Sequence, residues 1–188
     1  MKHYKMTATI VAVCVALQCL QSLCPAITPL QAFDLSNFLS PTLLPLAVIT
    51  IFTHMFSHAG FQHLLGNMML GVPVMLFLEH KMGSVRLLQV YLLCGLAALG
   101  TECCMPLSQG VMIGASGAIM GCFAASCAIM KKGPLLGALS LGLLFLSTVP
   151  NLQGLSMALL GGNIAYAAHI GGVLMGLFLM AGKQKKST

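Results

Sequence analysis

Apolar residues gather in six long segments, and polar residues lie mostly between them. The segments cover residues 6–23, 64–78, 85–99, 115–130, 135–149 and 155–181. A helix that crosses the roughly 30 Å hydrocarbon core of a membrane needs about 20 predominantly apolar residues. Several segments are shorter than that, and weakly polar neighbours extend them. The pattern predicts an all-α membrane protein in which residues 1–188 form a single bundle of six transmembrane helices.

Charge is scarce and unevenly placed. Apolar residues make up 58% of the 188 positions and charged residues 6%, and the mean hydropathy is +0.95. The nine Lys and Arg residues fall at 2 and 5, at 81 and 86, at 131 and 132, and at 183, 185 and 186. Six spans put these four places on one side, which the positive-inside rule makes cytoplasmic. We therefore expect a multi-pass protein of the cell (inner) membrane, with both termini cytoplasmic, the lipid bilayer as a partner and no nucleic acid partner.

The stretch 25–60 allows a second topology. An apolar run at 41–56 would give a seventh span, but the run is short and contains Pro41 and Pro45, which remove helical hydrogen bonds. A seventh span would also invert every basic loop after it. We interpret 25–60 as a long first outer loop, partly embedded at the membrane interface.

The first apolar segment also resembles a signal peptide. Lys2 and Lys5 precede it, and Cys24-Pro25 follows it, which is the order of parts in a secretory signal. The charge pattern requires this segment as a span, so we expect it to belong to the bundle.

Eight cysteines leave open whether disulfides form. Five of them lie within the expected spans, where a free cysteine behaves as a small apolar residue. Cys24, Cys103 and Cys104 lie near the outer face. A disulfide between Cys24 and one of the other two is compatible with the sequence but is not implied by it.

Three apolar segments each carry a polar residue at the same predicted depth. Asn67, Ser116 and His169 precede a lysine of the cytoplasmic face by 14, 15 and 14 residues. These lysines are Lys81, Lys131 and Lys183. At the helical rise the three polar groups lie about 21–22 Å from their lysines. A carboxamide, a hydroxyl and an imidazole in one plane resemble a serine hydrolase site within the bilayer.

Ser116 lies in the sequence Gly114-Ala115-Ser116-Gly117, which opens the fourth expected span. A serine at a helix N-terminus is close to free backbone N–H groups and to the positive end of the helix dipole, and both suit a developing oxyanion. Small residues are also common packing elements between membrane helices. The motif alone therefore fits helix packing as well as catalysis.

His169 favours the catalytic interpretation. An ionisable residue inside an apolar segment is costly and is a functional candidate by default. Both helices carry paired glycines that allow close approach: Gly117 and Gly121 in one, Gly172 and Gly176 in the other. If these faces meet, His169 reaches the Ser116 hydroxyl and serves as its general base.

No carboxylate is expected beside His169. The chain has three acidic residues, Asp34, Glu79 and Glu102, and none is predicted at its depth. A serine–histidine dyad is therefore expected, with the imidazole oriented by packing and not by an acid.

His63 and Asn67 are four residues apart and share one face of the second span. A carboxamide and an imidazole there are candidate hydrogen-bond donors to the oxyanion, beside the Ser116 N–H. His54, His58 and His63 also suggest zinc, but no His-Glu-x-x-His motif or suitably spaced cysteine accompanies them. We expect no metal and no organic cofactor.

Taken together, the chain resembles rhomboid intramembrane serine proteases of the basic six-span form. The resemblance covers about residues 50–182 and rests on His63-Leu-Leu-Gly-Asn67, Gly114-Ala-Ser116-Gly117, and Ala168-His169-Ile-Gly-Gly172 followed by Gly176. It implies that Ser116 is the nucleophile, His169 its base, and His63 with Asn67 the oxyanion donors. The implied reaction is peptide-bond hydrolysis in transmembrane protein substrates, which enter laterally past span five.

Two residues depart from the family pattern. Where many members have Trp-Arg in the first outer loop, this chain has Ile49-Thr50, and where many have an aromatic ring against the histidine, it has Met120. Two other functions stay open. A catalytically inactive rhomboid-like protein would bind transmembrane clients, but it would usually lack the dyad. A transporter would more naturally show repeats or paired charges.

Overall fold

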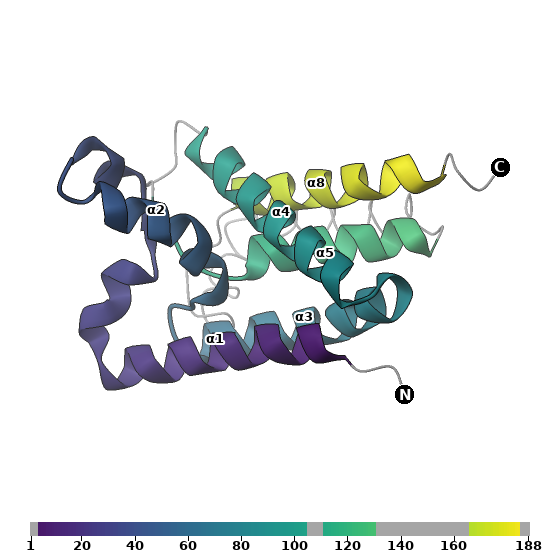
Figure 1. Cartoon of the computed structure of the whole chain (residues 1–188), viewed down its shortest axis with the longest axis horizontal. Coiled ribbons are helices and arrows are strands. Elements are labelled where there is room, and N and C mark those ends of the chain that lie inside the picture. Colours follow the sequence, from purple (N-terminus) through teal and green to yellow (C-terminus); the bar gives the residue numbers. More distant parts are fainter. Residues whose placement is uncertain (1–3, 105–110, 131–165, 185–188) are drawn as a thin grey trace, which may run out of the picture.

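A computed structural model describes residues 4–104, 111–130 and 166–184, and nearly all of them are helical (Figure 1). The long helices lie side by side, with the start of the first and the end of the last at one end of the bundle. They are α1 Lys5–Leu23, α3 Phe61–Met82, α4 Ser84–Cys103, α5 Ser116–Ile129 and α8 Tyr166–Gln184. The all-α membrane bundle is confirmed. The predicted span 135–149 and the first part of 155–181 lie outside the described residues.

The described helices differ in how far they reach. α1, α3 and α4 are long and apolar enough to cross a membrane, whereas α5 and the apolar part of α8, Ala167–Ala181, are shorter. The 14 residues of α5 extend only about 21 Å. α5 is short because it begins at Ser116 itself, after a stretch of extended chain.

Glu79 joins three helices at one end of the bundle. Its carboxylate accepts hydrogen bonds from the Met6 and Thr7 N–H groups, both at 2.9 Å. It also accepts from the hydroxyls of Thr7 and Ser84, at 2.7 Å and 2.6 Å. The two N–H groups belong to the first turn of α1, where no intrahelical acceptor exists. α1 is therefore fastened to the α3–α4 turn as part of the bundle, which disfavours the signal-peptide interpretation.

The outer stretch 25–60 contains a helix that the sequence did not predict. α2 has 10 residues, a length of about 15 Å, which is about half of an average hydrocarbon core and disfavours the seven-span alternative. Pro45 occupies one of the first two positions of α2, where its missing N–H has no partner to lose. The elements of this stretch are η1 Pro25–Leu30, β1 Phe33–Asp34, η2 Leu35–Leu39, α2 Leu44–Thr53 and η3 His54–Phe56.

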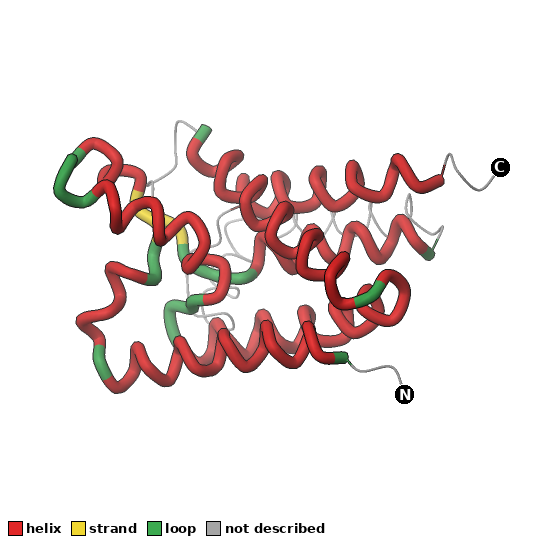
Figure 2. The backbone as a smooth tube through the Cα atoms, viewed as in Figure 1, coloured by secondary structure: helices red, strands yellow, loops and turns green. Residues whose placement is uncertain are grey.

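Two short strands tie the outer stretch to the chain before Ser116. β1 pairs antiparallel with β2, Val111–Met112, so that Phe33 is opposite Met112 (Figure 2). Phe33 and Met112 are both buried. Irregular backbone at membrane depth is tolerated only where its polar groups are satisfied within protein, and this pairing satisfies part of it.

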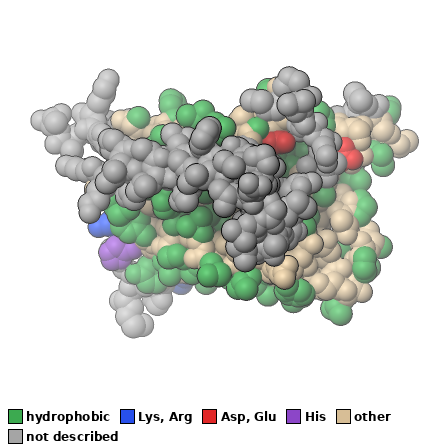
Figure 3. All heavy atoms as spheres, turned by 180° about the vertical axis from the view of Figure 1, so that it is seen from behind, with side chains coloured by type: hydrophobic (Ala, Val, Ile, Leu, Met, Phe, Trp, Pro, Cys, Tyr) green, Lys and Arg blue, Asp and Glu red, His purple; other side chains and the backbone are tan. Residues whose placement is uncertain are grey.

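Charged side chains lie toward the ends of the molecule. In the face shown in Figure 3, Lys or Arg atoms and a histidine lie at one end, acidic atoms lie nearer the other, and hydrophobic side chains are spread over the described part of the surface. All eight cysteines fall in the part of the chain that the structure describes, and all are free. Cys24 is therefore not bonded to Cys103 or Cys104.

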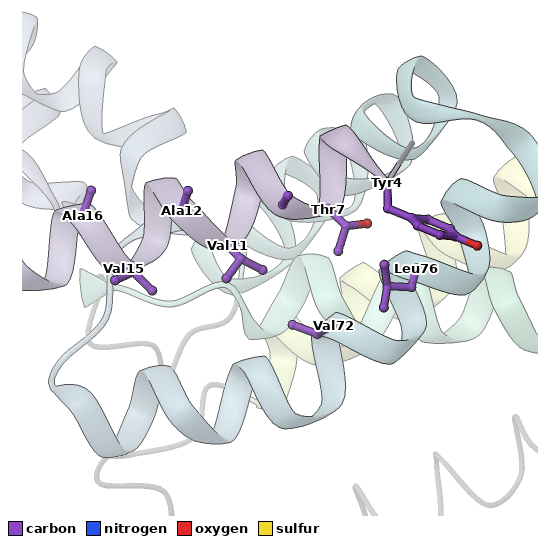
Figure 4. Close-up of a pocket in the computed structure, with 9 residues that line it drawn as sticks. Tyr4, Thr7, Val11, Ala12, Val15, Ala16, Val72 and Leu76 are labelled. Carbon is purple, nitrogen blue, oxygen red and sulfur yellow. The ribbon is translucent and has the colours of Figure 1, made fainter. Parts of the chain in front are cut away.

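An open apolar groove runs between α1 and α3 (Figure 4). Most of its lining comes from α1, and Val72 and Leu76 of α3 face that helix. Neither Ser116 nor His169 contributes to it. The groove is therefore separate from the site that the sequence predicts.

Candidate active site

Ser116 is the first residue of α5, as the sequence predicts. Ala115 precedes it as the N-cap without a side-chain hydrogen bond, and the Ile119 N–H donates to the Ala115 carbonyl at 3.0 Å. The N–H groups of Ser116, Gly117 and Ala118 come before that first helical bond, so the helix itself supplies them no acceptor. These donors point toward the positive end of the α5 dipole, which favours a bound anion or a developing oxyanion.

Gly114 brings the His63 imidazole against the backbone beside Ser116. Its φ of +133° is a conformation that residues with a side chain rarely adopt. A Cβ at Gly114 would lie 2.8 Å from His63 Cε1, 3.1 Å from its Nε2 and 3.8 Å from Ser116 Oγ. The imidazole and the hydroxyl therefore flank the same point of the chain, although 53 residues separate them in sequence (116 − 63).

The hydrogen bonding of His63 fixes its tautomer. The Ala59 N–H donates to His63 Nδ1 at 3.3 Å. Because a backbone N–H can only donate, Nδ1 is the unprotonated nitrogen and the neutral ring carries its proton on Nε2. Nε2 is the ring nitrogen that faces Gly114. His63 therefore presents an N–H donor on the side of Ser116.

Asn67 lies one turn further along α3 and is buried. Its side-chain nitrogen donates to the His63 carbonyl at 3.2 Å, which anchors the carboxamide to its own helix. The second N–H of that nitrogen is not used by this bond. Among the described residues, no hydrogen bond links Asn67 to α5 or α8. The geometry thus brings His63 to Ser116 more directly than it brings Asn67.

The glycine faces of α5 and α8 are in backbone contact. A Cβ at Gly172 would overlap the carbonyl of Gly117, and a Cβ at Gly176 would overlap that of Gly121. A Cβ at Gly117 would lie 3.5 Å from the Ala168 carbonyl oxygen. The residue after Ser116 therefore packs against the α8 turn that contains His169, with Gly172 against its carbonyl and the Ala168 carbonyl nearby.

His169 lies on α8 and is half-buried. Within the described ranges, the Ser116 hydroxyl and the His169 imidazole share no hydrogen bond. Such bonds are often long in unliganded enzymes and tighten only when substrate binds.

The expectation that no carboxylate lies near His169 needs correction. Glu102, at the end of α4, accepts a hydrogen bond from the Ala168 N–H at 3.2 Å. The carboxylate therefore lies one peptide unit from His169, bonded to backbone and not to the imidazole. This bond depends on the approach of α4 to α8, and no local sequence signal indicates it.

His54 and His58 lie behind His63 and are fully buried. The His58 and His63 ring centroids are 5.3 Å apart. Burial lowers the pKa of the His54 imidazole and lowers that of His58 to about 3, so both are neutral at pH 7. No group of three or more metal-ligating side chains occurs in the described part of the chain, so the zinc alternative gains no support.

Two comparisons bear on this site. Residues 45–185 match the family model of the Rhomboid domain, and this range contains every candidate site residue. The chain is 30% identical over 138 residues to RHOMBOID-like protein 5 of Arabidopsis thaliana. The match covers 65% of this chain and 40% of that protein, so the chain spans less than half the length of this relative.

Proposed function

The chain belongs to the rhomboid family, an integral membrane family, and from this premise we propose that it is an intramembrane serine protease. The observation that carries the proposal is the contact between Gly117 and Ala168. It brings together the backbone positions next to a serine and a histidine that lie on different membrane helices. Glycine at four positions of this contact, 117, 121, 172 and 176, lets the two helices come this close.

In the proposed mechanism His169 removes the proton of Ser116, and the serine oxygen attacks the scissile carbonyl. The tetrahedral intermediate collapses to an acyl-enzyme when the leaving amine takes the proton from His169. Water, deprotonated by the same imidazole, then releases the acyl product. Both half-reactions need the imidazole neutral at the start of each attack.

The oxyanion would form beside the donors that converge on Gly114. The Ser116 N–H and the Nε2–H of His63 are the two that the geometry favours. The remaining N–H of the Asn67 carboxamide is a third candidate, since its first N–H is bonded to its own helix. Donors of this kind are each worth about 3–4 kcal/mol of transition-state stabilisation.

The substrates would be transmembrane proteins whose outer portion unwinds, because a helical backbone cannot present its carbonyl to Ser116. Lateral entry past the predicted span 135–149 is part of this proposal, and that span lies outside the described residues. Cytoplasmic termini would put the substrate-binding end on the outer side of the membrane, where water reaches Ser116.

A catalytically inactive, client-binding protein is the second candidate. It is favoured by the lack of a hydrogen bond between Ser116 and His169 among the described residues and by Met120, which replaces the ring that orients the histidine in many family members. A thioether holds an imidazole less rigidly than an aromatic ring does.

A serine-directed fluorophosphonate separates the two candidates. Without an adjacent base, a serine hydroxyl is a poor nucleophile. The purified protein in detergent should be labelled at Ser116, not at all in Ser116→Ala, and at least about 100-fold more slowly in His169→Ala. Labelling should weaken as pH falls, because imidazolium cannot accept the serine proton.

Ser126→Ala is the matched control, because that serine lies on the same helix with its hydroxyl bonded to the Cys122 carbonyl at 2.9 Å. It should label as fast as the unmodified protein. Equal labelling of the unmodified protein and folded His169→Ala would refute the dyad. No labelling and no cleavage of a transmembrane reporter after long incubation would favour the inactive protein.

A further inference from the structure

An acidic side chain of α4 accepts a hydrogen bond from the backbone of α8. Its own first turn contains no acidic residue, although negative charge at a helix N-terminus is stabilising. Ala168 is the third described residue of α8, and its N–H points toward the start of that helix. The Glu102 carboxylate of α4 takes this N–H at 3.2 Å, in a partly buried position.

Close packing of α4 on α8 brings the carboxylate there. A Cβ at Gly171 would lie 2.6 Å from the Ala97 carbonyl oxygen and would overlap the Thr101 hydroxyl. The Thr101 hydroxyl donates a hydrogen bond to the Ala97 carbonyl at 2.8 Å. Its donor is therefore used within α4 and does not bond to the α8 backbone. Glu102 is the next residue, at the point where α4 passes the first turn of α8.

The Ala168 residue is consequently held from two sides. Its N–H is bonded to Glu102, and its carbonyl oxygen lies against Gly117. That carbonyl belongs to the peptide bond that leads into His169. The position of the His169 backbone is therefore set by Gly117, which follows the candidate nucleophile, and by Glu102.

We propose that Glu102 is a positioning residue that holds His169 at the distance and angle needed to act on Ser116. The inference rests on the proposed function, because it assigns Glu102 a role in that same reaction. Glu102 acts through the Ala168 N–H. A misplaced base slows the chemical step and leaves substrate binding nearly unchanged.

Three variants test this role: Glu102→Ala, which removes the acceptor, Glu102→Gln, which keeps an acceptor oxygen, and Asp34→Ala as control. Asp34 is an acidic residue of the stretch 25–60, far from α8 in sequence. Its carboxylate accepts hydrogen bonds from the N–H of Ser36, at 2.9 Å, and from the Ser36 hydroxyl. Cleavage of a transmembrane reporter in liposomes is measured per folded enzyme.

We expect kcat to fall about 10-fold to 100-fold in Glu102→Ala, with KM within about threefold of the original value. Glu102→Gln should restore kcat to within about threefold of the unmodified enzyme, and Asp34→Ala should match it. Loss of kcat in Glu102→Gln as large as in Glu102→Ala would overturn the role of the hydrogen bond. So would a Glu102→Ala enzyme with unchanged kcat.

Amide hydrogen exchange gives a readout that does not need proteolysis. The Ala168 amide should exchange at least about 10-fold faster in Glu102→Ala than in the unmodified protein, and this protection should return in Glu102→Gln. An unmodified protein that cuts no reporter would defeat the proposed function, and the exchange result would still decide whether Glu102 holds α8. Equal Ala168 exchange in all variants would overturn the inference.

Discussion

The α5–α8 contact and the α1–α3 contact show two ways of joining membrane helices. α5 and α8 meet through glycine backbones, so carbonyl groups of α5 occupy the space that side chains of α8 would need. α1 and α3 are joined at one end by the Glu79 carboxylate, and an apolar groove separates them further along (Figure 4). The glycine contact leaves no space for even one added methyl group between α5 and α8 at Gly172 and Gly176. The Glu79 contact joins α1 to α3 at one end of the two helices only.

The difference coincides with where precision is needed. Ser116 and His169 lie on the helices that are in backbone contact, whereas no candidate site residue lies on α1. A catalytic pair tolerates little misplacement, because an error of 1 Å can cost about 100-fold in rate. The comparison therefore predicts that the two contacts respond differently to the same kind of substitution.

The largest effect is expected when a side chain is added to the close contact. Gly172→Leu places a Cβ on the Gly117 carbonyl, so α8 must move away and carry His169 with it. Reporter cleavage should fall at least about 100-fold. Ala12→Leu is the control, since Ala12 is exposed in the groove, and cleavage should stay within about twofold. Comparable losses in both variants would show that the two contacts do not differ.

The next effect concerns α3, which packs against α1 and also carries His63 and Asn67 to the candidate site. His63→Ala removes the Nε2–H beside Gly114 and should lower kcat by about 10²–10³. Asn67→Ala should cost less, because one of its N–H groups is already bonded within α3. Steady-state cleavage of the two folded variants decides the order. A larger loss in Asn67→Ala would make the carboxamide the main oxyanion donor.

A smaller effect, and one on stability, is expected at the open contact. Glu79→Ala leaves the N–H groups of Met6 and Thr7 without their acceptor and should lower the free energy of unfolding by about 2–4 kcal/mol. The kcat of the remaining folded enzyme should change little. Thermal unfolding in detergent tests the loss of stability, and cleavage per folded molecule tests whether kcat is unchanged. A fall in kcat at unchanged stability would link α1 to the chemistry.

The smallest effect is a pH dependence of stability from the outer stretch. The folded protein keeps His54 and His58 neutral, with the pKa of His58 lowered to about 3. The unfolded chain takes up protons near pH 6.5, so this stability is present above pH 6.5 and is lost as pH falls toward 3. Between pH 7 and 5.5 the loss from His58 is about 1 kcal/mol.

His58→Gln should reduce that pH dependence relative to the unmodified protein. Unfolding in denaturant at several pH values measures the dependence. Identical curves for His58→Gln and the unmodified protein would show that His58 is not responsible.

Much of the fold follows from local patterns in the chain. The apolar segments predicted α1, α3 and α4 because each forms most of a helix, and Gly114 to Gly117 predicted where α5 begins. α2 was missed because Pro45 suggests a helix break, although it lies where a helix tolerates proline. β1 and β2 were missed because two residues carry no strand periodicity.

In the candidate site too, local patterns predict some features and miss others. His63 and Asn67 share a face because they are four residues apart, and a sequence shows that spacing directly. The bond from Ala168 to Glu102 joins residues 66 positions apart and depends on Gly171 admitting Thr101. Contacts of that kind depend on how three helices pack, and a pattern along one helix carries no information about them.

The shortness of α5 has a consequence for how the protein meets its lipids. A helix of 14 residues falls about 9 Å short of an average hydrocarbon core. Hydrophobic mismatch of this size is relieved by local thinning of the bilayer or by tilt. The depth of Ser116 below the headgroups is therefore a property of the protein and the lipid together. Acyl-chain length becomes a variable of any assay, as temperature and pH are.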